Sequence, residues 1–500
     1  MRRAAALALL LAASAGALPA PGRAAAAVQD RPWFLESASQ LRLEAPAADT
    51  SPATRAELRE LRRLQRHRTR ARERAVRRWG SGPATIPWTR VALETIASNR
   101  AGAFPTRSAR ALAVLHLGMH DALVAARDSR AVYDRARPAE LDEKIRPLLP
   151  VRGSSYPDER AVVAGAAGAI LSYLFPDAPE GKFEELAAEA AESRLWAGVS
   201  FRSDVRRGLS LGRQVAAAAI ERAEADGHRA PWDGASERRC STEGCSGADE
   251  TYWVPTPPAY QYPPSDPMAS KWETYLLETP GQFLPPPPPA YGSDRFMTEL
   301  AEVKRLSTEA TEDERELAFF WDDGPGTYSP AGHWNDIAIG LARNRRLSTM
   351  ETARAFALMN AAMRDAFVAT WHAKYHYWSI RPVTVIRERA TIGGEPNPVY
   401  DPGWLPNLVT PPFPAYPSGH SAESAAAARV LQYLMPDSGE PSRAIVAEPG
   451  PAGSIDELAE QVAYSRLLGG IHLRSDNDAA LVLGRKIAAL AIERDAGGDS

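Results

Sequence analysis

The sequence contains little cysteine and little lysine. Only two of the 500 residues are cysteine, Cys240 and Cys245, and only six of the 59 basic residues are lysine. Two cysteines cannot complete a four-ligand zinc site, so we predict that they form a local disulfide in an exported chain. Because almost every background cation is arginine, a lysine inside a motif needs an explanation of its own.

Several signatures of common enzyme classes are also missing from the sequence. It has no P-loop, no G-x-G-x-x-G after a strand, no G-x-S-x-G elbow and no H-E-x-x-H. The 59 basic and 62 acidic residues give a net charge of −3, which excludes a generally basic nucleic-acid-binding protein. No segment reaches the ~20 apolar residues of a membrane span, so we expect no stable membrane insertion.

The N-terminus has the composition of a secretory signal. Arg2 and Arg3 precede an alanine- and leucine-rich run, and small residues follow near Ala27. We therefore predict a signal peptide over residues 1–27 and an exported protein, either periplasmic or secreted.

Alanine and leucine at helical spacing dominate the rest of the chain, which predicts an all-α protein. We expect an arginine-rich N-terminal extension (28–87), an N-terminal helical bundle (88–226), a proline-rich irregular connection (227–295) and a C-terminal helical bundle (296–500). Residues 54–78 carry 11 arginines and three glutamates. We interpret this run as a solvated helix rather than a surface for an anionic polymer. The expected helical runs are 91–126, 161–175, 182–197, 205–225, 297–320, 330–345, 349–379, 421–434, 455–468 and 476–494.

Three segments of the C-terminal half collect cations and histidines. In the first, Lys374 and Arg381 lie seven residues apart, nearly two helical turns, which predicts that both occupy one helix face. Pro382 should end that helix at Arg381. Two cations on one apolar, tryptophan-rich face favour a shared anion.

The second segment is Pro417-Ser418-Gly419-His420, followed by an alanine-rich run. Free N–H groups and a hydroxyl at the positive end of a helix form an anion site. His420 is placed to move a proton at whatever binds there.

The third segment contains Ser465-Arg466, a glycine pair, His472 and Asp476. The glycines should break the helix between Arg466 and His472. Asp476 can orient the His472 ring if the local turn is helical. The three segments together favour a bound oxyanion, either phosphate or vanadate.

The pattern K-x6-R-P, P-S-G-H and S-R-x5-H-x3-D resembles a known signature. Type-2 phosphatidic acid phosphatases, bacterial class A acid phosphatases and vanadium-dependent haloperoxidases share it. The flanking residues are similar to the haloperoxidase branch, and the resemblance covers, in pieces, residues 88–490. These flanks are Trp371, the lead-in 411–416 and the stretch 320–327.

The resemblance implies two related helical bundles with the active site in the C-terminal one, and vanadate as the cofactor. His472 would bind the metal, and His420 would take a proton from hydrogen peroxide. Halide would be oxidised to hypohalous acid, which halogenates a small organic acceptor. The vanadate oxygens would be neutralised by Lys374, Arg381, Arg466, Ser418 and the Gly419 N–H.

The resemblance also assigns residues around this site. Phe413 stands where the family has a residue associated with halide selection, here in the aromatic form of chloroperoxidases, and Trp371 would share that pocket. Asp476 would orient His472, and Asp323 resembles a carboxylate that pairs with the site arginines. Apart from the resemblance, we expect His333, beside Trp334, to pack near the site entrance.

Two other functions remain open at this point. The same scaffold could serve an acid phosphatase, with His472 as the nucleophile of a phosphohistidine and His420 protonating the leaving alcohol. It could also store or sense the anion without catalysis, although binding alone would not require His420.

Overall fold

The protein is almost entirely helical, as the sequence predicted. The computed structural model describes residues 31–99, 104–232, 234, 251–436 and 453–497. In this part of the chain the sheet structure is limited to a hairpin of β1 (Thr391–Ile392) and β2 (Glu395–Pro396), with an isolated bridge between Tyr252 and Ser379. The predicted signal peptide and both cysteines lie outside the described residues.

The N-terminal half contains helices α1 to α8. Their bounds are α1 (Pro52–Arg66), α2 (Arg70–Gly80), α3 (Ile86–Ser98), α4 (Pro105–Tyr133), α5 (Pro138–Leu141), α6 (Glu159–Leu174), α7 (Lys182–Trp196) and α8 (Arg202–Glu224). The arginine-rich run 54–78 falls on α1 and α2, so its helical character is confirmed. Both helices pack against α7.

The C-terminal half contains helices α9 to α16. Their bounds are α9 (Asp294–Glu309), α10 (Glu312–Phe320), α11 (Ser329–Asn344), α12 (Thr349–Tyr377), α13 (Pro382–Glu388), α14 (Gly419–Leu434), α15 (Ile455–Leu468) and α16 (Arg474–Asp495). No described helix is both long enough and apolar enough to cross a membrane.

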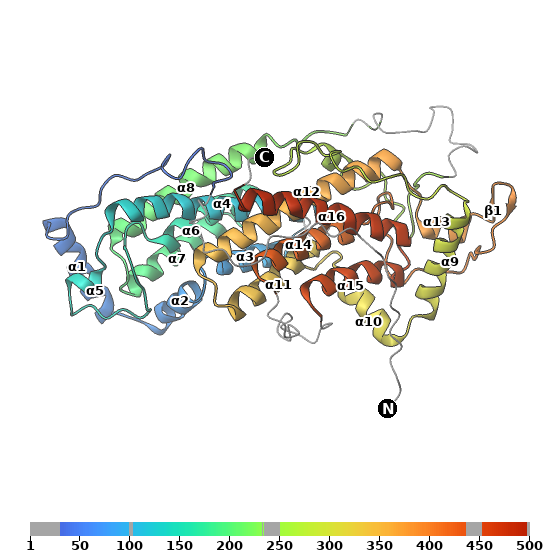
Figure 1. Ribbon diagram of the computed structural model, residues 1–500. Coiled ribbons are helices and arrows are strands. Elements are labelled where there is room, and N and C mark those ends of the chain that lie inside the picture. The colour runs from blue at the N-terminus through green and yellow to red at the C-terminus, as the bar shows by residue number, and fades with distance from the viewer. Residues whose placement is uncertain (1–30, 100–103, 233, 235–250, 437–452, 498–500) are drawn as a thin grey trace.

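The two halves meet along α4 and α12, the longest helices of the chain (Figure 1). Around them, α6 to α8 lie toward one end of the elongated molecule and α9, α10 and α13 toward the other. One large apolar cluster contains residues of both halves, including Leu112 of α4 and Phe356 of α12. Burial of this cluster therefore holds the halves together.

Two predicted helical runs are each divided in the structure. The run 297–320 is interrupted at Ala310 and Thr311, where Thr311 starts α10 through a reciprocal capping box with Glu314. The run 91–126 falls on α3 and α4. At Thr311 a capping box therefore starts a new helix where apolar periodicity alone predicted continuity.

The connection 227–295 is irregular, as expected, apart from the short 3-10 helix η2 (Pro267–Lys271) among its described residues. Tyrosines of the helical body fix its proline segment 285–289. The hydroxyl groups of Tyr377 and Tyr416 each donate a hydrogen bond of 2.6 Å, to the carbonyls of Pro285 and Pro286. The connection is therefore packed against the C-terminal half.

Candidate functional site

Lys374 and Arg381 lie close together, but not on one helix as predicted. α12 ends at Tyr377, because Trp378 adopts a left-handed conformation (φ 50°) and its N–H caps the Lys374 carbonyl. Arg381 is instead the residue before α13, which starts at Pro382. The helix-face prediction is therefore wrong, since the chain turns between the two cations.

Both cations surround the aromatic ring of Phe413. The Lys374 Nζ and the Arg381 guanidinium each lie 5.1 Å from the ring centroid, and both side chains are fully buried. Lys374 donates to the carbonyls of Pro414 (2.8 Å) and Ala415 (2.7 Å). Backbone carbonyls and an aromatic face thus partly compensate the two buried charges.

Phe413 also contacts Trp371, as the predicted shared pocket requires. Their ring centroids lie 4.8 Å apart, and the Trp371 N–H donates to the carbonyl of Ser265 at 3.2 Å. Trp371 also explains the glycine of the second motif, since a Cβ at Gly419 would lie 3.2 Å from its ring. The indole therefore lies directly beside the start of α14.

Ser418, Gly419 and His420 form the N-terminus of α14. Ser418 is its N-cap, fully buried, and accepts a hydrogen bond from the Ser421 N–H. The Nε2 of His420 lies 3.2 Å from the carbonyl oxygen of Asp322. Because a carbonyl only accepts, Nε2 carries the proton and Nδ1 is left as the basic nitrogen.

Arg466 and His472 are separated by the turn that ends α15. The helix stops at Leu468, and Gly470 has a φ of 75°, which glycine adopts without strain. The Nδ1 of His472 lies 2.9 Å from the carboxylate of Asp476, in the first turn of α16. The predicted orientation of His472 by Asp476 is present in the structure.

Arg381 connects the first and third motifs. Its Nη1 donates to the Ile471 carbonyl at 2.9 Å and lies 3.3 Å from the Nε2 of His472. Its Nη2 is buried without a hydrogen-bond partner. The structure therefore brings the residues of the three motifs together in one site of the C-terminal half, with an unpaired cationic N–H group among them. These residues are Lys374, Arg381, Arg466, Ser418, Gly419, His420, His472 and Asp476.

Burial and mutual repulsion govern the titration of these groups. Burial, followed by the charge of Arg381, holds the pKa of Lys374 well below its usual range. Burial also lowers the pKa of Arg381 to about 9 and that of Arg466 to about 10. The pKa of His472 falls well below its usual range through burial and then through Arg381 and Lys374. An anion placed among these cations would offset their mutual repulsion by its attraction to each of them.

Asp323 requires a correction. It does not hydrogen-bond a site arginine; its carboxylate lies 3.0 Å from the Nδ1 of His333, whose ring stacks on Trp321. Arg466 instead donates to the Trp321 carbonyl and to the Ser465 hydroxyl, and it feels Asp322 and Asp323 only through their charge. The positive φ of Asp323 (48°) turns the chain so that its side chain meets α11.

Glu423 is a buried acid that the sequence interpretation did not single out. It is fully buried, and neither carboxylate oxygen has a hydrogen-bond partner. Burial and the charge of Asp323 raise its pKa well above the usual range, which favours its neutral form. The sequence could have pointed to Glu423, because it is the one acidic residue of α14 and lies one helical turn after His420.

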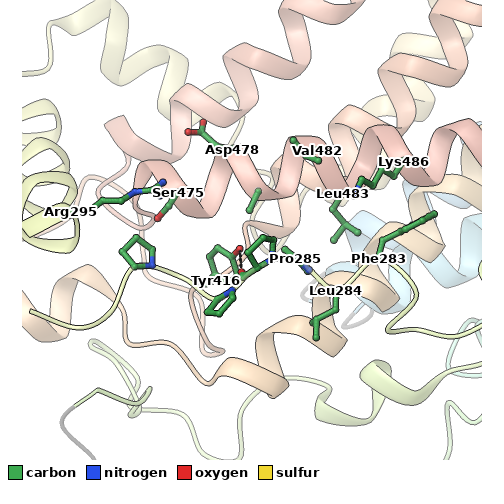
Figure 2. A pocket seen from close by; sticks show the side chains of 14 residues that line it. Phe283, Leu284, Pro285, Arg295, Tyr416, Ser475, Asp478, Val482, Leu483 and Lys486 are labelled. Carbon is green, nitrogen blue, oxygen red and sulfur yellow. Dashed lines mark hydrogen bonds between the residues drawn. The ribbon is translucent and has the colours of Figure 1, made fainter. Parts of the chain in front are cut away.

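A cavity of about 370 Å³ lies between the proline segment and α16 (Figure 2). Arg295 and Lys486 stand at its edges, and Ser475 and Tyr416 contribute to its wall. Of the predicted site residues none belongs to its lining. Ser475 and Tyr416 are chain neighbours of Asp476 and Pro417, so the cavity lies beside the candidate site rather than within it.

The donor set favours an anion over a metal cation. The described residues contain no cluster of three or more His, Cys, Asp or Glu side chains that could hold a metal ion. The cations Lys374, Arg381 and Arg466 are instead grouped around one histidine whose second nitrogen is held by a carboxylate. Such a set matches an oxyanion that is bound by charge and by one imidazole nitrogen.

Comparisons with known proteins agree with this set of site residues. The chain matches the family described as the VCPO second helical-bundle domain over residues 181–227 and 354–496. The second range contains every predicted metal, cation and acid–base residue. The chain is therefore similar to this family over those two ranges.

Individual haloperoxidases are similar over much of the chain. The vanadium chloroperoxidase of Curvularia inaequalis is 25% identical over 394 residues, which are 66% of this chain and 61% of that protein. The structure described as the first bacterial vanadium-dependent iodoperoxidase is 26% identical. It superimposes with a TM-score of 0.64 over 83% of this chain and 96% of its own. A holo-type bacterial vanadium-dependent chloroperoxidase (TM-score 0.57, 17% identical, 81% and 96% covered) shares the fold.

Proposed function

We propose that this haloperoxidase relative is a vanadate-dependent enzyme that oxidises halide with hydrogen peroxide to hypohalous acid, which then halogenates organic acceptors. The observation that carries the proposal is the arrangement around His472. Its Nδ1 is held by Asp476, and its Nε2 lies 3.3 Å from the Nη1 of buried Arg381, whose Nη2 has no hydrogen-bond partner. The haloperoxidases named above support the same class of reaction.

The residues present fit vanadate. The Nη2 of Arg381 is an unpaired buried donor, and the N-terminus of α14 adds free N–H groups beside the Ser418 hydroxyl. His472 would hold the vanadium through Nε2, and the cations with Ser418 and Gly419 would hold the oxygens. When bound, vanadate would supply a Lewis acid that activates peroxide for attack by halide.

The chain itself contributes positioning and proton transfer. Asp476 keeps the proton of His472 on Nδ1, so that Nε2 remains an acceptor. His420 has its proton on Nε2, facing the Asp322 carbonyl, so its Nδ1 can accept a proton from hydrogen peroxide. Burial and the neighbouring Arg466 hold the pKa of His420 well below its usual range, which keeps the ring unprotonated near pH 7 and its Nδ1 open to a proton.

The apolar side of the site is formed by Phe413 and Trp371. A halide ion beside Phe413 would lie near Lys374 and Arg381, both of which contact the ring of Phe413. These cations would stabilise a halide that the aromatic wall shields from water. We therefore place halide selection at Phe413.

A paired assay tests the proposal. The purified chain is loaded with vanadate, and halogenation of a phenolic dye is followed with hydrogen peroxide and chloride, bromide or iodide in turn. Hydrolysis of nitrophenyl phosphate is measured without vanadate. We expect halogenation that depends on vanadate. Phosphatase activity inhibited by vanadate, with no halogenation at any vanadate concentration, would overturn the proposal in favour of the phosphatase.

A further inference from the structure

The helices of the two halves correspond in order and length. α4 and α12 each have 29 residues, α6 and α14 each have 16, and α8 and α16 have 23 and 22. Both short helices α5 and α13 begin at a proline that follows an arginine, at Arg137-Pro138 and Arg381-Pro382. The series α1–α8 therefore repeats the series α9–α16.

The N-terminal series also repeats the spacing of the oxyanion motifs. Arg130 precedes Arg137 by seven residues, as Lys374 precedes Arg381. Tyr-Pro precedes both α6 and α14. The third motif recurs with one replacement: Ser193-Arg194, Ser200 and Asp204 have the spacing of Ser465-Arg466, His472 and Asp476.

Equivalent hydrogen bonds to backbone carbonyls fix both copies. Arg137 Nη1 donates to the Val199 carbonyl at 2.8 Å, as Arg381 Nη1 donates to that of Ile471 at 2.9 Å. The turn after each serine-arginine pair places a glycine at a φ of 73° or 75°. Two further backbone bonds of the N-terminal copy run from Val199 N to Arg194 O (3.2 Å) and from Asp158 N to Asp204 O (3.3 Å). Their equivalents in the C-terminal copy run from Ile471 N to Arg466 O (3.2 Å) and from Ser418 N to Asp476 O (3.0 Å).

Close helix packing repeats in the same place. A Cβ on Gly212 of α8 would come within 2.0 Å of the Val162 carbonyl oxygen in α6. A Cβ on Gly484 of α16 would come equally close to the Ala422 carbonyl oxygen in α14. Each glycine lies eight residues after the aspartate of the third motif. The backbones of the two copies are therefore built alike around the motif residues.

The copies differ in what occupies the centre. Where α14 is capped by Ser418, α6 is capped by Asp158, whose carboxylate accepts from the Ala161 N–H at 3.0 Å. The other oxygen of Asp158 accepts from the Arg194 Nε at 3.2 Å and from the hydroxyl of Ser200. The carboxylate thus binds the residues that correspond to Arg466 and His472.

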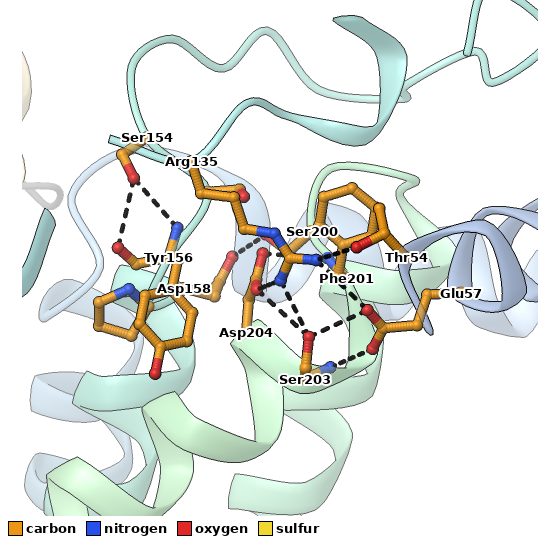
Figure 3. Close-up of polar contacts among 12 residues, drawn as sticks. Thr54, Glu57, Arg135, Ser154, Tyr156, Asp158, Ser200, Phe201, Ser203 and Asp204 are labelled. Atoms are coloured by element: carbon orange, nitrogen blue, oxygen red, sulfur yellow. Dashed lines mark hydrogen bonds and ion pairs between the residues drawn. The ribbon is translucent and has the colours of Figure 1, made fainter. Parts of the chain in front are cut away.

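The residues for chemistry are missing from this copy. Ser200 replaces the histidine that would bind the central atom. Arg160 replaces His420, and it donates to the carbonyls of Trp79 and Gly82 in and after α2. Asp204, which corresponds to Asp476, is held by Arg135 and Ser203 (Figure 3). This copy can hold an anion but has no imidazole for proton transfer or covalent bonding.

The positive charge of the arginines in this copy exceeds the negative charge of the Asp158 carboxylate. Arg137 and Arg194 are buried near the carboxylate of Asp158, and Glu140 also acts on Arg137 through its charge. Arg130 acts on Arg137 as a further cation, and the Nη1 of Arg194 is buried without a hydrogen-bond partner. Burial alone would raise the pKa of Asp158, but Arg194 and Ser200 lower it to about 2, so it is ionised. We propose that the N-terminal half contains a second oxyanion site, of the same construction as the first, whose anion is the carboxylate of Asp158.

The variant Asp158→Ser tests this proposal, because it installs the residue of the other copy and keeps a side chain that can cap α6. Binding of radiolabelled inorganic phosphate is measured by equilibrium dialysis. We expect the variant to bind one equivalent more than the wild type. In chloride, the melting temperature of Asp158→Ser should be lower than that of the wild type. When chloride is replaced by phosphate at equal ionic strength, the melting temperature of the variant should rise by more than that of the wild type. An unchanged number of equivalents with an unchanged response to phosphate would overturn the proposal.

Asp158→Asn is the matched control. Its amide fills the same space without the charge, so it should melt lower than the wild type and bind no additional phosphate. If Asp158→Ser behaves like Asp158→Asn, the second site is refuted. Adding Arg194→Met to Asp158→Ser should remove the additional equivalent. Because the gain is counted relative to the wild type, and halogenation by the C-terminal half should persist, failure here is distinct from failure of the proposed function.

Discussion

The Nδ1 of His472 and the carboxylate oxygen Oδ2 of Asp476 lie 2.9 Å apart at the start of α16. Asp476 also accepts the Leu473 N–H at 3.1 Å, so one carboxylate both caps the helix and orients the ring. Burial raises the pKa of Asp476, and the charges of Lys374 and Arg381 oppose that effect. The helix start and the imidazole are thereby fixed by the same side chain.

Asp476→Asn should weaken vanadate binding. The amide can donate to Nδ1, which would move the ring proton to Nε2 and remove the acceptor. Loss of such an orienting partner costs on the order of 10- to 100-fold in metal affinity. Titration with vanadate measures the Kd. Asp476→Glu, which keeps the charge, should recover part of the loss, and an Asp476→Asn variant with wild-type affinity would contradict the assignment.

Substitutions of His420 and His472 should separate vanadate binding from turnover. His472→Ala should abolish vanadate retention after gel filtration, since it removes Nε2. His420→Ala should retain vanadate but lose about 10²- to 10⁴-fold in halogenation rate, the usual contribution of a general base. Tight vanadate binding by His472→Ala would show that another residue holds the metal.

The contact between Asp323 and His333 predicts how the pKa of His333 responds to substitution. Burial lowers the pKa of His333, but the charge and hydrogen bond of Asp323 outweigh it and raise the pKa above its ordinary value of 6.5. In Asp323→Asn the pKa of His333 should therefore fall, as measured by NMR titration of the ring protons. Asp336→Asn is the control, because Asp336 acts on His333 through charge alone and should shift it less. Equal shifts in both variants would contradict the direct pairing.

His116 should make the protein less stable in acid. It lies in the interface of α4 and α12, 5.0 Å from the Phe356 ring, and burial lowers its pKa to about 3. Between the ordinary pKa of 6.5 and about 3, only the unfolded chain binds the proton. The free energy of unfolding should therefore decrease as the pH falls, by up to about 1.4 kcal/mol per pH unit.

His116→Leu should remove that share of the pH dependence while it keeps the interface apolar. Denaturant unfolding at several pH values between 7 and 4 measures it. The exposed His67 offers a matched substitution, His67→Gln, which should leave the slope as in the wild type. A slope that His116→Leu leaves unchanged would show that other groups cause the acid sensitivity.

Much of the fold and of the candidate site could be predicted from the sequence because the relevant signals are local. Apolar periodicity indicated most helices, and the cap at Ser418 and the turn at Gly470 lie within a few residues of the motifs that predicted them. The predictions were wrong where a single backbone conformation outweighed periodicity. Trp378 ends α12 before Arg381, and Thr311 starts a new helix. Neither event changes the apolar pattern.

The sequence by itself determined the all-α class, the order of the three motifs and the kinds of side chain they supply. Only the tertiary structure decided which of those groups are paired, because pairing joins residues far apart in the chain. Arg381 meets His472 across 91 residues, and Asp323 meets His333 instead of an arginine. The same packing places Asp158 against Arg194 and Ser200, a contact between loops and helix ends that spacing alone did not reveal. Burial then sets the charge balance, since an unpaired group costs free energy only once water is excluded.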